Sequence, residues 1–491
     1  MTRIQMANKI KEAVDNIEND KLPYYLSLDR EHLEYLQSLL YELMEEFRRE
    51  LITIGVTVAQ IEDDDVDSDD DERALDLSKF MDFKPVSQVD TEQVFTSLGS
   101  ADSIPMENKN GLRLDDGYNL RLRSNAWITF FNHLTFSARP AFRLTDNENE
   151  IFLDEAAAKL AVSNVELSVE KSGMWWGPGA HGAMLMSNNA EPLSVVRLRS
   201  ITPFQLPWEL KHMGSFGLNF FVGRLEKDRR VPRPDIAGLR IGYSPLPYLS
   251  LGASRVAVMG GDNRANPRSG DYWKIFMAKA KDEFTTGEEK RTDTDQLAAM
   301  DMKFAIPFGP DNFIATGMEA YTEWAGEDRF SFWENESPGL LMGLFLTNLF
   351  RDEGTDFRVE YAKNKPAWYN HGIFNAAGTG TAYTYKGDVI GHHMGGDSDD
   401  FFIRISKELP FLSNPFFNSI GIGAQLDIER NDLSGSTGQE KIETGADVLL
   451  TTIDRLDILL KYEMEYYRNL NGVSGKTARN HIVSLEGNLR F

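Results

Sequence analysis

The chain has 491 residues, of which 41% are hydrophobic and 11% aromatic, and its formal net charge is −24. The absence of cysteine excludes a disulfide framework and thiolate metal sites, and the acidic balance argues against a nucleic-acid partner, which requires a basic surface. No run of about 18 apolar residues occurs, which excludes a transmembrane helix. The mean hydropathy of −0.38 fits a soluble all-β protein, and it also fits a barrel whose lipid-facing and lumen-facing residues cancel in the average.

Residues 1–27 begin without a signal peptide, because the segment from Met1 to Ile10 has neither a basic start nor an apolar stretch. We expect the signal peptide upstream, with this start inside a longer gene. The Thr2-Arg3 pair opens a short segment that is similar to the second helix of an S-layer homology module. We therefore predict a remnant of such a module over residues 1–27, with peptidoglycan or another cell-wall polymer as its partner.

Residues 28–61 carry apolar side chains every three or four positions, as at Leu33, Leu36, Leu40, Leu43, Phe47 and Leu51. This spacing predicts a long amphipathic helix, with Asp29 as its cap. Two interpretations stay open: coiled-coil oligomerisation in the periplasm, or packing of the helix on its own chain.

Residues 62–115 are predicted to form an acidic, polar linker. Nine of the eleven residues from Glu62 to Glu72 are acidic, and such density stays solvated. Asp65, Asp67 and Asp69 have the spacing of a calcium loop, but the glycine and the distal glutamate of that loop are missing, which favours the linker. We place the boundary of the next domain at residue 116.

From residue 116 to residue 491 the apolar period changes to two. Alternating runs occur at 237–243, 357–361, 401–405 and 456–466. Their lengths approach the nine to eleven residues that a tilted strand needs to cross a bilayer. Aromatic residues at several run ends resemble the girdles of membrane barrels. Soluble sandwiches alternate too, but their strands average nearer five or six residues.

The C-terminal run favours the membrane barrel. His481, Val483, Leu485, Gly487, Leu489 and Phe491 share one face of a final alternating strand. A last strand that ends in a terminal phenylalanine is similar to the signal read by the barrel-assembly machinery of the outer membrane. This pattern predicts an all-β transmembrane barrel of outer-membrane type.

Three sequence blocks carry a family resemblance. The first is Trp175-Trp176-Gly177-Pro178-Gly179 followed by Ser187-Asn188-Asn189-Ala190. The second runs from Ser244 to Arg255 and continues to Arg264, and the third runs from Trp368 to Gly372 and from Tyr383 to Asp397. Their content and order resemble the Wzi capsule-assembly family over about residues 115–491.

The resemblance implies a single barrel of about eighteen antiparallel strands, preceded here by the short α-helical periplasmic segment. It also implies an outer-membrane lectin that binds capsular or surface polysaccharide and helps to attach or assemble it at the cell surface. The family is not thought to be catalytic, and no cofactor is expected. Besides the polysaccharide, we expect outer-membrane lipid as a partner and no nucleic acid.

Sugar recognition needs aromatic faces and planar hydrogen-bonding groups, and the three blocks supply both. The alternative is structural: bulky aromatics that fill the lumen, and glycines that let the chain bend. Any metal site remains unknown, and no catalytic residue is predicted. The glycan-binding candidates are Trp175, Trp176, Arg255, Arg264, Trp368, Tyr369, His371, Tyr383, Tyr385, His392 and Asp397.

Two other functions remain open. A porin-like channel for small polar solutes, anchored to the cell wall, would need an open lumen. An outer-membrane hydrolase is disfavoured, because the sequence has neither a Gly-x-Ser-x-Gly elbow nor a His-Glu-x-x-His helix. We therefore predict a binding protein that is not an enzyme.

Overall fold

The computed structural model describes residues 81–262, 264, 270, 294–309, 311–327, 339–366, 368–370, 382–411, 416–452 and 455–491. The predictions for residues 1–27 and 28–61, and for the first part of the acidic linker, lie outside these residues.

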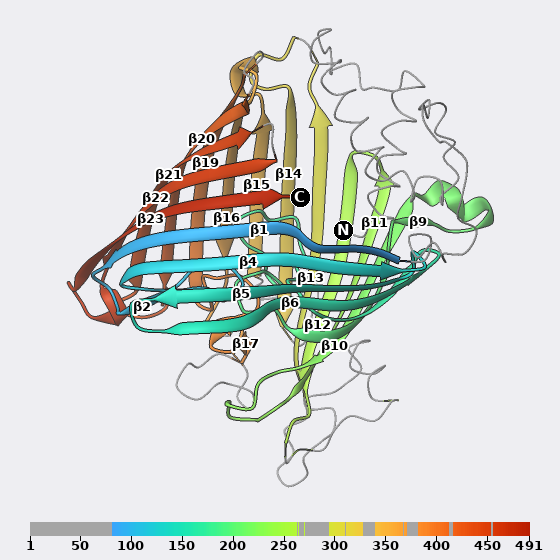
Figure 1. Ribbon diagram of the computed structural model, residues 1–491, viewed down its shortest axis with the longest axis horizontal. Helices are drawn as coiled ribbons and strands as arrows, with labels where there is room; N and C mark the ends of the chain where they lie inside the picture. Colours follow the sequence, from blue (N-terminus) through green and yellow to red (C-terminus); the bar gives the residue numbers. More distant parts are fainter. Residues whose placement is uncertain are drawn as a thin grey trace, which may run out of the picture.

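The described chain is dominated by one antiparallel sheet that closes on itself (Figure 1). Strands β8 and β9 both pair with β10, so the 19 strands of the sheet occupy eighteen positions around the ring. The wall consists of β1 (Met81–Leu98), β4 (Gly117–Phe130), β5 (Leu134–Thr145), β6 (Asn149–Val162), β7 (Val165–Lys171), β8 (Ser194–Ser200), β9 (Phe204–Gln205), β10 (Ser215–Arg224), β11 (Asp235–Leu246), β12 (Leu249–Met259), β13 (Thr294–Pro307), β14 (Gly317–Glu327), β15 (Gly339–Thr347), β16 (Thr355–Lys363), β19 (Ser398–Pro410), β20 (Phe417–Asn431), β21 (Gln439–Thr452), β22 (Leu456–Arg468) and β23 (Thr477–Arg490).

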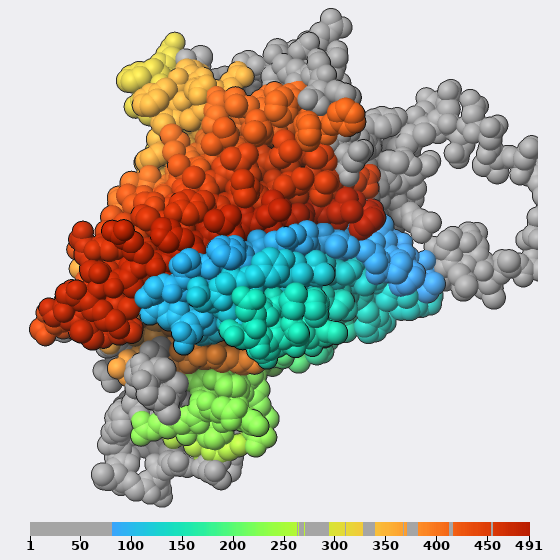
Figure 2. All heavy atoms as spheres, turned by 60° about the vertical axis from the view of Figure 1, so that its left-hand side comes forward, coloured from blue at the N-terminus to red at the C-terminus, as the bar shows by residue number. Residues whose placement is uncertain are grey.

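The ring closes where the first wall strand meets the last. β1 pairs with β23 over eleven residue pairs, from Gln88 opposite Arg490 to Leu98 opposite Asn480. Its other edge pairs with β4. The blue surface of β1 accordingly lies directly against the red surface of β23 in Figure 2. A closed ring leaves no unpaired edge, so the predicted barrel of about eighteen strands is confirmed.

The two faces of the wall differ as the period of two requires. On β23 the side chains of Val483 and Leu485 are about two-fifths exposed, whereas the alternating Ile482 and Ser484 are buried. The exposed apolar members face away from the lumen, as a lipid-facing surface demands. The predicted alternation of the C-terminal strand is therefore confirmed.

The two ends of the barrel carry different connections. Short turns, such as 163–164 and 247–248, join strands at the end where Met81 and Phe491 lie. Long segments, including 172–193, 260–293 and 364–397, leave the opposite end. The connections between wall strands contain smaller elements: β2 (Ser103–Pro105) with β3 (Arg113–Asp115), β17 (Thr384–Tyr385) with β18 (Asp388–Val389), and the 3-10 helices η2 (Trp208–Met213), η3 (Leu349–Arg351) and η4 (Leu470–Gly472).

The structure corrects the predicted boundary at residue 116. The barrel begins at Met81, and β1, β2 and β3 all lie in the segment that the sequence suggested was a linker. The reason is the polarity of β1. Its buried, inward-facing side chains include Asp90, Glu92 and Thr96, and only one apolar residue, Phe95, is strongly exposed on the part paired with β23. A strand that faces a polar lumen shows weak apolar alternation.

In the part of the chain that is described, no helix combines the length and the apolar character needed to span a membrane.

Candidate functional site

Two loop segments fold into the ring and form what we call the plug: residues 172–193 and the described residues of 364–397. Their buried side chains pack against inward-facing residues of β8 and of β10 to β16, and together they make the largest apolar cluster of the described chain. The plug contributes Met174, Trp176, Met184, Leu185, Met186, Ala190, Leu193, Trp368, Tyr369, Ala382, Tyr383, Tyr385, Ile390 and Met394.

Trp176 packs the first plug segment against the barrel wall. Its ring lies edge-on to Phe221 of β10, with ring centroids 5.3 Å apart. Gly238 of β11 provides the space, because a Cβ there would stand 2.8 Å from the Trp176 ring and 2.4 Å from Phe221. The side chain of Trp176 is only 2% exposed, so it is a packing residue.

Buried wall carboxylates hold the backbone of the same segment. Glu360 of β16 accepts hydrogen bonds from the backbone N–H groups of Ala180, His181 and Gly182 at 2.8, 3.1 and 3.0 Å. The hydroxyl of Tyr321 donates a fourth, at 2.8 Å. A carboxylate is a strong acceptor, and in a buried setting each such bond is stabilising.

Tyrosine hydroxyls join the two plug segments to each other. Tyr369 donates to the carbonyl of Met184 at 2.5 Å and accepts from the backbone N–H of His392 at 2.9 Å. Tyr383 donates to the carbonyl of Leu185 at 2.8 Å. Burial raises the pKa of both tyrosines well above the ordinary value, so both hydroxyls stay protonated and able to donate.

Most of the glycan-binding candidates from the sequence are packing residues of this plug. Exposure is 8% or less for Trp176, Trp368, Tyr369, Tyr383, Tyr385 and His392. Their faces contact protein, which supports the structural alternative for these six. Asp397 accepts a hydrogen bond from the backbone N–H of Ser434 at 3.1 Å and so links the second plug segment to the loop after β20.

The remaining candidates are dispersed. Arg255 lies on β12 between Ser254 and Val256, and the Val256 side chain belongs to the inner apolar cluster, so Arg255 points out of the lumen. Its guanidinium contacts Gln296 of β13. Arg264 lies in the loop that follows β12. His371 lies outside the described residues.

Trp175 and Trp176 both line a hollow of about 310 Å³ inside the barrel, and Trp175 differs from the six buried candidates because its side chain is only half-buried. Its indole N–H donates to the Gly179 carbonyl at 3.0 Å, which fixes the ring at the edge of the hollow. Three inward-facing arginines, Arg197, Arg199 and Arg240, line the same space. Each forms an ion pair with a buried carboxylate, at distances of 2.6 to 3.0 Å. We call this space the arginine pocket.

The arginine pocket offers the chemistry that a sugar requires: an aromatic face and planar donors suited to hydroxyl and carboxylate groups. The sequence analysis missed its three arginines, because they lie outside the recognised blocks. A signal was present on β8, where Arg197 and Arg199 share the face opposite Val196 and Leu198. Two cations on the inward face of a barrel strand indicate a polar lumen lining.

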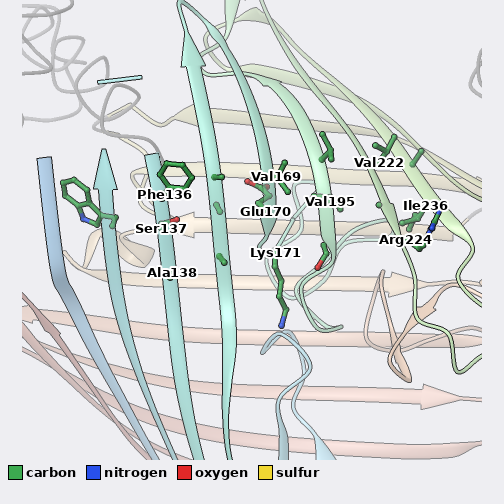
Figure 3. A pocket seen from close by; sticks show the side chains of 18 of the residues that line it. Phe136, Ser137, Ala138, Val169, Glu170, Lys171, Val195, Val222, Arg224 and Ile236 are labelled. Carbon is green, nitrogen blue, oxygen red and sulfur yellow. The ribbon is translucent and has the colours of Figure 1, made fainter. Parts of the chain in front are cut away.

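A larger hollow, of about 1,020 Å³, has a different character (Figure 3). It extends across strands from β4 to β12, and its lining is mostly apolar. The exposed members Phe136, Val169 and Val196 are 43 to 63% exposed and face away from the lumen. Lipid chains fit such a surface, whereas a polar ligand would lose its hydrogen bonds there.

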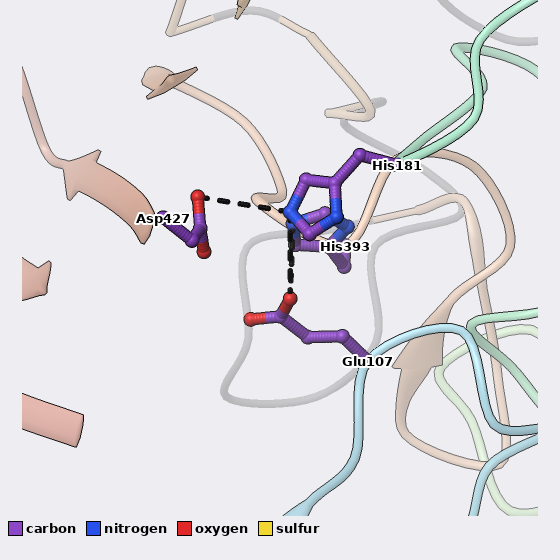
Figure 4. A group of neighbouring side chains, drawn as sticks. All are labelled: Glu107, His181, His393 and Asp427. Atoms are coloured by element: carbon purple, nitrogen blue, oxygen red, sulfur yellow. Dashed lines mark ion pairs between the residues drawn. The ribbon is translucent and has the colours of Figure 1, made fainter. Parts of the chain in front are cut away.

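Histidines and carboxylates form a second polar site inside the barrel, at the end with the long loops. Glu107, His181, His393 and Asp427 converge from four separate segments (Figure 4). Burial lowers the pKa of His181, but the carboxylates of Asp400 and Asp427 outweigh it and raise the pKa to about 10. Burial, assisted by the nearby His181, lowers the pKa of His393 to about 4. The sequence analysis named none of these four residues.

The comparisons with known proteins give one family match and two individual relatives. The sequence model described as capsule assembly protein Wzi matches residues 90–482. An uncharacterized 55.8 kDa protein of the cps region of Klebsiella pneumoniae is 24% identical over 255 residues, a match that covers 51% of this chain and 46% of that relative. A solved structure described as Wzi, an outer membrane protein involved in group 1 capsule assembly in Escherichia coli and a carbohydrate-binding β-barrel, superimposes with a TM-score of 0.60. It is 16% identical, and the match covers 82% of this chain and 85% of that one.

Proposed function

Because the chain belongs to the capsule assembly protein Wzi family, we propose that it binds capsular or other surface polysaccharide and helps to assemble or attach it at the cell surface. The chain is an outer-membrane β-barrel of the fold seen in the Escherichia coli protein. That protein is described as a carbohydrate-binding barrel, and the same kind of binding is proposed here.

The observation that carries the proposal is the arginine pocket under Trp175. Among the aromatic residues of the three sequence blocks, Trp175 combines a half-buried ring with a position on a polar hollow. A sugar ring stacked on the indole would place its hydroxyl or carboxylate groups near Arg197 and Arg199. The buried carboxylates that pair with these arginines hold the guanidinium groups in place, so that their N–H groups can serve as donors to sugar hydroxyl or carboxylate groups.

A glycan array probed with detergent-purified barrel tests this function. We expect the unchanged protein to retain host surface polysaccharide, and Trp175→Ala to bind about fivefold more weakly, since a lost stacking contact costs about 1 kcal/mol. Trp208→Ala is the matched control, because Trp208 is 84% exposed on η2, away from the arginine pocket. Binding that is undetectable for the unchanged protein, or that is equal in both variants, would exclude the pocket as the glycan site.

The surroundings of the barrel follow from its two ends. Outer-membrane barrels have short periplasmic turns and longer extracellular loops. Because Met81 and Phe491 lie at the short-turn end, the proposal places residues 1–80 on the periplasmic side. There they would reach peptidoglycan or another cell-wall polymer. Outer-membrane lipid would cover the apolar outer wall, including the hollow of Figure 3.

A porin-like channel and a hydrolase are the alternatives, and the proposed role is binding without catalysis. The plug supports binding over conduction, because its backbone is held to β16 by Glu360 and its side chains are buried against eight wall strands. In a planar bilayer we expect no steady current from the unchanged protein. A stable open-channel conductance would favour the channel.

A further inference from the structure

The polar cluster of Figure 4 joins loops that are distant in sequence to one side of the wall. Glu107 lies between β2 and β3, His181 in the first plug segment and His393 in the second. Asp427 belongs to β20, and Asp400 belongs to the neighbouring β19. The four labelled side chains point toward a common centre (Figure 4).

The distances between the donor atoms suit a shared cation. Nε2 of His181 lies 3.6 Å from Oδ1 of Asp427 and 3.8 Å from Oε2 of Glu107. Nε2 of His393 lies 3.4 Å from the same Glu107 oxygen. Zinc takes nitrogen and oxygen ligands at about 2.0–2.2 Å in a tetrahedron, whose ligand atoms are then about 3.3–3.6 Å apart. One atom from each of the four residues lies within 4.8 Å of the others.

Two carboxylates and two imidazole nitrogens of the cluster are buried without ordinary hydrogen bonds. Asp427 is 0% exposed and Asp400 is 2% exposed. Within the described ranges, both oxygens of each carboxylate, together with Nε2 of His181 and of His393, have no hydrogen-bond partner of acceptable geometry. Leaving buried polar atoms in this condition is costly, so the arrangement calls for a species that satisfies several of them at once.

The charge balance indicates that this species is a cation. Five carboxylates surround the cluster, and Lys441, whose side chain is 8% exposed, forms ion pairs with four of them. These carboxylates therefore face a single lysine, and a divalent cation would offset part of the excess of negative groups. The five are Glu107, Asp400, Asp427, Glu429 and Glu443.

The donor types select the class of cation. Imidazole nitrogens with carboxylate oxygens suit zinc and neighbouring divalent transition metals, whereas calcium and magnesium prefer oxygen ligands alone. The two rings are also held in place: His181 stacks on Phe402 with centroids 4.0 Å apart, and the amide of Asn108 lies 3.4 Å from Nδ1 of His393. Outer contacts of this kind orient metal-binding histidines.

We propose that His181, His393, Glu107 and Asp427 bind a divalent transition metal ion of the zinc class, with Asp400 beside it. Such an ion joins both plug segments and the β2–β3 loop to β20, independently of glycan binding. In the competing arrangement there is no metal, and His393 forms an ion pair with Asp400 through Nε2, 2.9 Å from the carboxylate oxygen.

The test is the metal content of the folded barrel. Purified protein is stripped with a chelator, equilibrated with Zn²⁺ and analysed by elemental mass spectrometry, with the faster migration of the unboiled protein on a gel as the check of folding. We expect about one tightly bound zinc per chain. The His181→Ala, His393→Ala double variant should bind at least tenfold more weakly. The control is His133→Ala, His481→Ala, because His133 lies in a short turn and His481 faces outward.

A second measurement uses Co²⁺, whose visible absorption reports nitrogen and oxygen ligation directly. The spectrum should appear in the unchanged protein and in the control, and should be lost in Asp427→Asn, which preserves the shape of the side chain. Folded, unchanged protein that holds less than about a tenth of an ion per chain would overturn the proposal, as would equal binding by the double variant. If the double variant does not fold, the stoichiometry of the unchanged protein and the Asp427→Asn spectrum decide.

Discussion

Glu360 shows how one buried side chain determines the position of a loop. Its carboxylate accepts hydrogen bonds from three consecutive backbone N–H groups of the first plug segment. Because these donors belong to the backbone, the acceptor has to come from the wall, whatever side chains the segment carries. The segment begins in the Trp-Trp-Gly-Pro-Gly block and continues through residues 180–182, so the block is positioned from the wall.

Glu360→Gln should therefore weaken the attachment of the plug. The amide that replaces the carboxylate is a weaker acceptor and adds a donor facing three N–H groups, so we expect a loss of about 2–3 kcal/mol. The measurement is the free energy of unfolding in denaturant for the detergent-solubilised barrel. Glu319→Gln is the control, because Glu319 is about one-third exposed and 3.6 Å from Lys303. The control should change by less than about 0.5 kcal/mol. Equal effects in the two variants would contradict the assignment.

At the scale of single residues, the sequence indicated which segments are rich in aromatic and polar residues better than it indicated what each of those residues contacts. The first and third blocks coincide with the two plug segments, and six of the aromatic and histidine candidates are buried there against protein. Arg197, Arg240 and His181 were not foreseen as members of polar sites. Their significance depends on which strands become neighbours across the lumen, and no local spacing contains that information.

Strand β11 has two glycines, Gly238 and Gly242, whose surroundings differ. Both lie on its inward face, with Arg240 between them on the same face. A Cβ at position 238 would overlap Phe221 and Trp176, whereas a Cβ at position 242 would meet nothing within 4 Å.

Gly238→Ala should destabilise the docking of the plug by about 1–3 kcal/mol through overpacking, and Gly242→Ala should have little effect. Thermal unfolding of the two variants provides the measurement. A second readout is limited proteolysis: Gly238→Ala should raise the sensitivity of residues 172–193 to protease while the wall strands stay protected. Identical melting temperatures would contradict the predicted overpacking of Phe221 and Trp176 at position 238.

Strand prediction succeeded where one face is apolar. The runs at 237–243, 357–361, 401–405 and 456–466 all lie inside observed strands, because lipid exposure enforces apolar residues at every second position. β1 was missed since its paired region carries Asp90 and Glu92 inward and few apolar residues outward. Hydropathy detects contact with lipid, and it says little about a strand whose inward side chains face a polar lumen.

For the whole molecule, closure of the ring predicts heat-modifiable migration. Eighteen strand positions joined edge to edge should resist detergent until heated, so the unboiled protein should migrate faster on a gel than the boiled protein. Gels with and without boiling measure this directly. Equal mobility of the two samples would be incompatible with an intact barrel.

The pairing of β1 with β23 also bears on how the protein is made. These neighbours stand about 400 residues apart, as Gln88 and Arg490 illustrate, so the seam that completes the ring forms from the two chain-distant ends. Closing so long a loop is entropically costly and slow. Until it closes, two strands present unsatisfied backbone groups to the membrane interior. We therefore expect a chain that lacks β23 to leave the ring open, and we expect assembly of the full chain to depend on a factor that covers both edges until they pair.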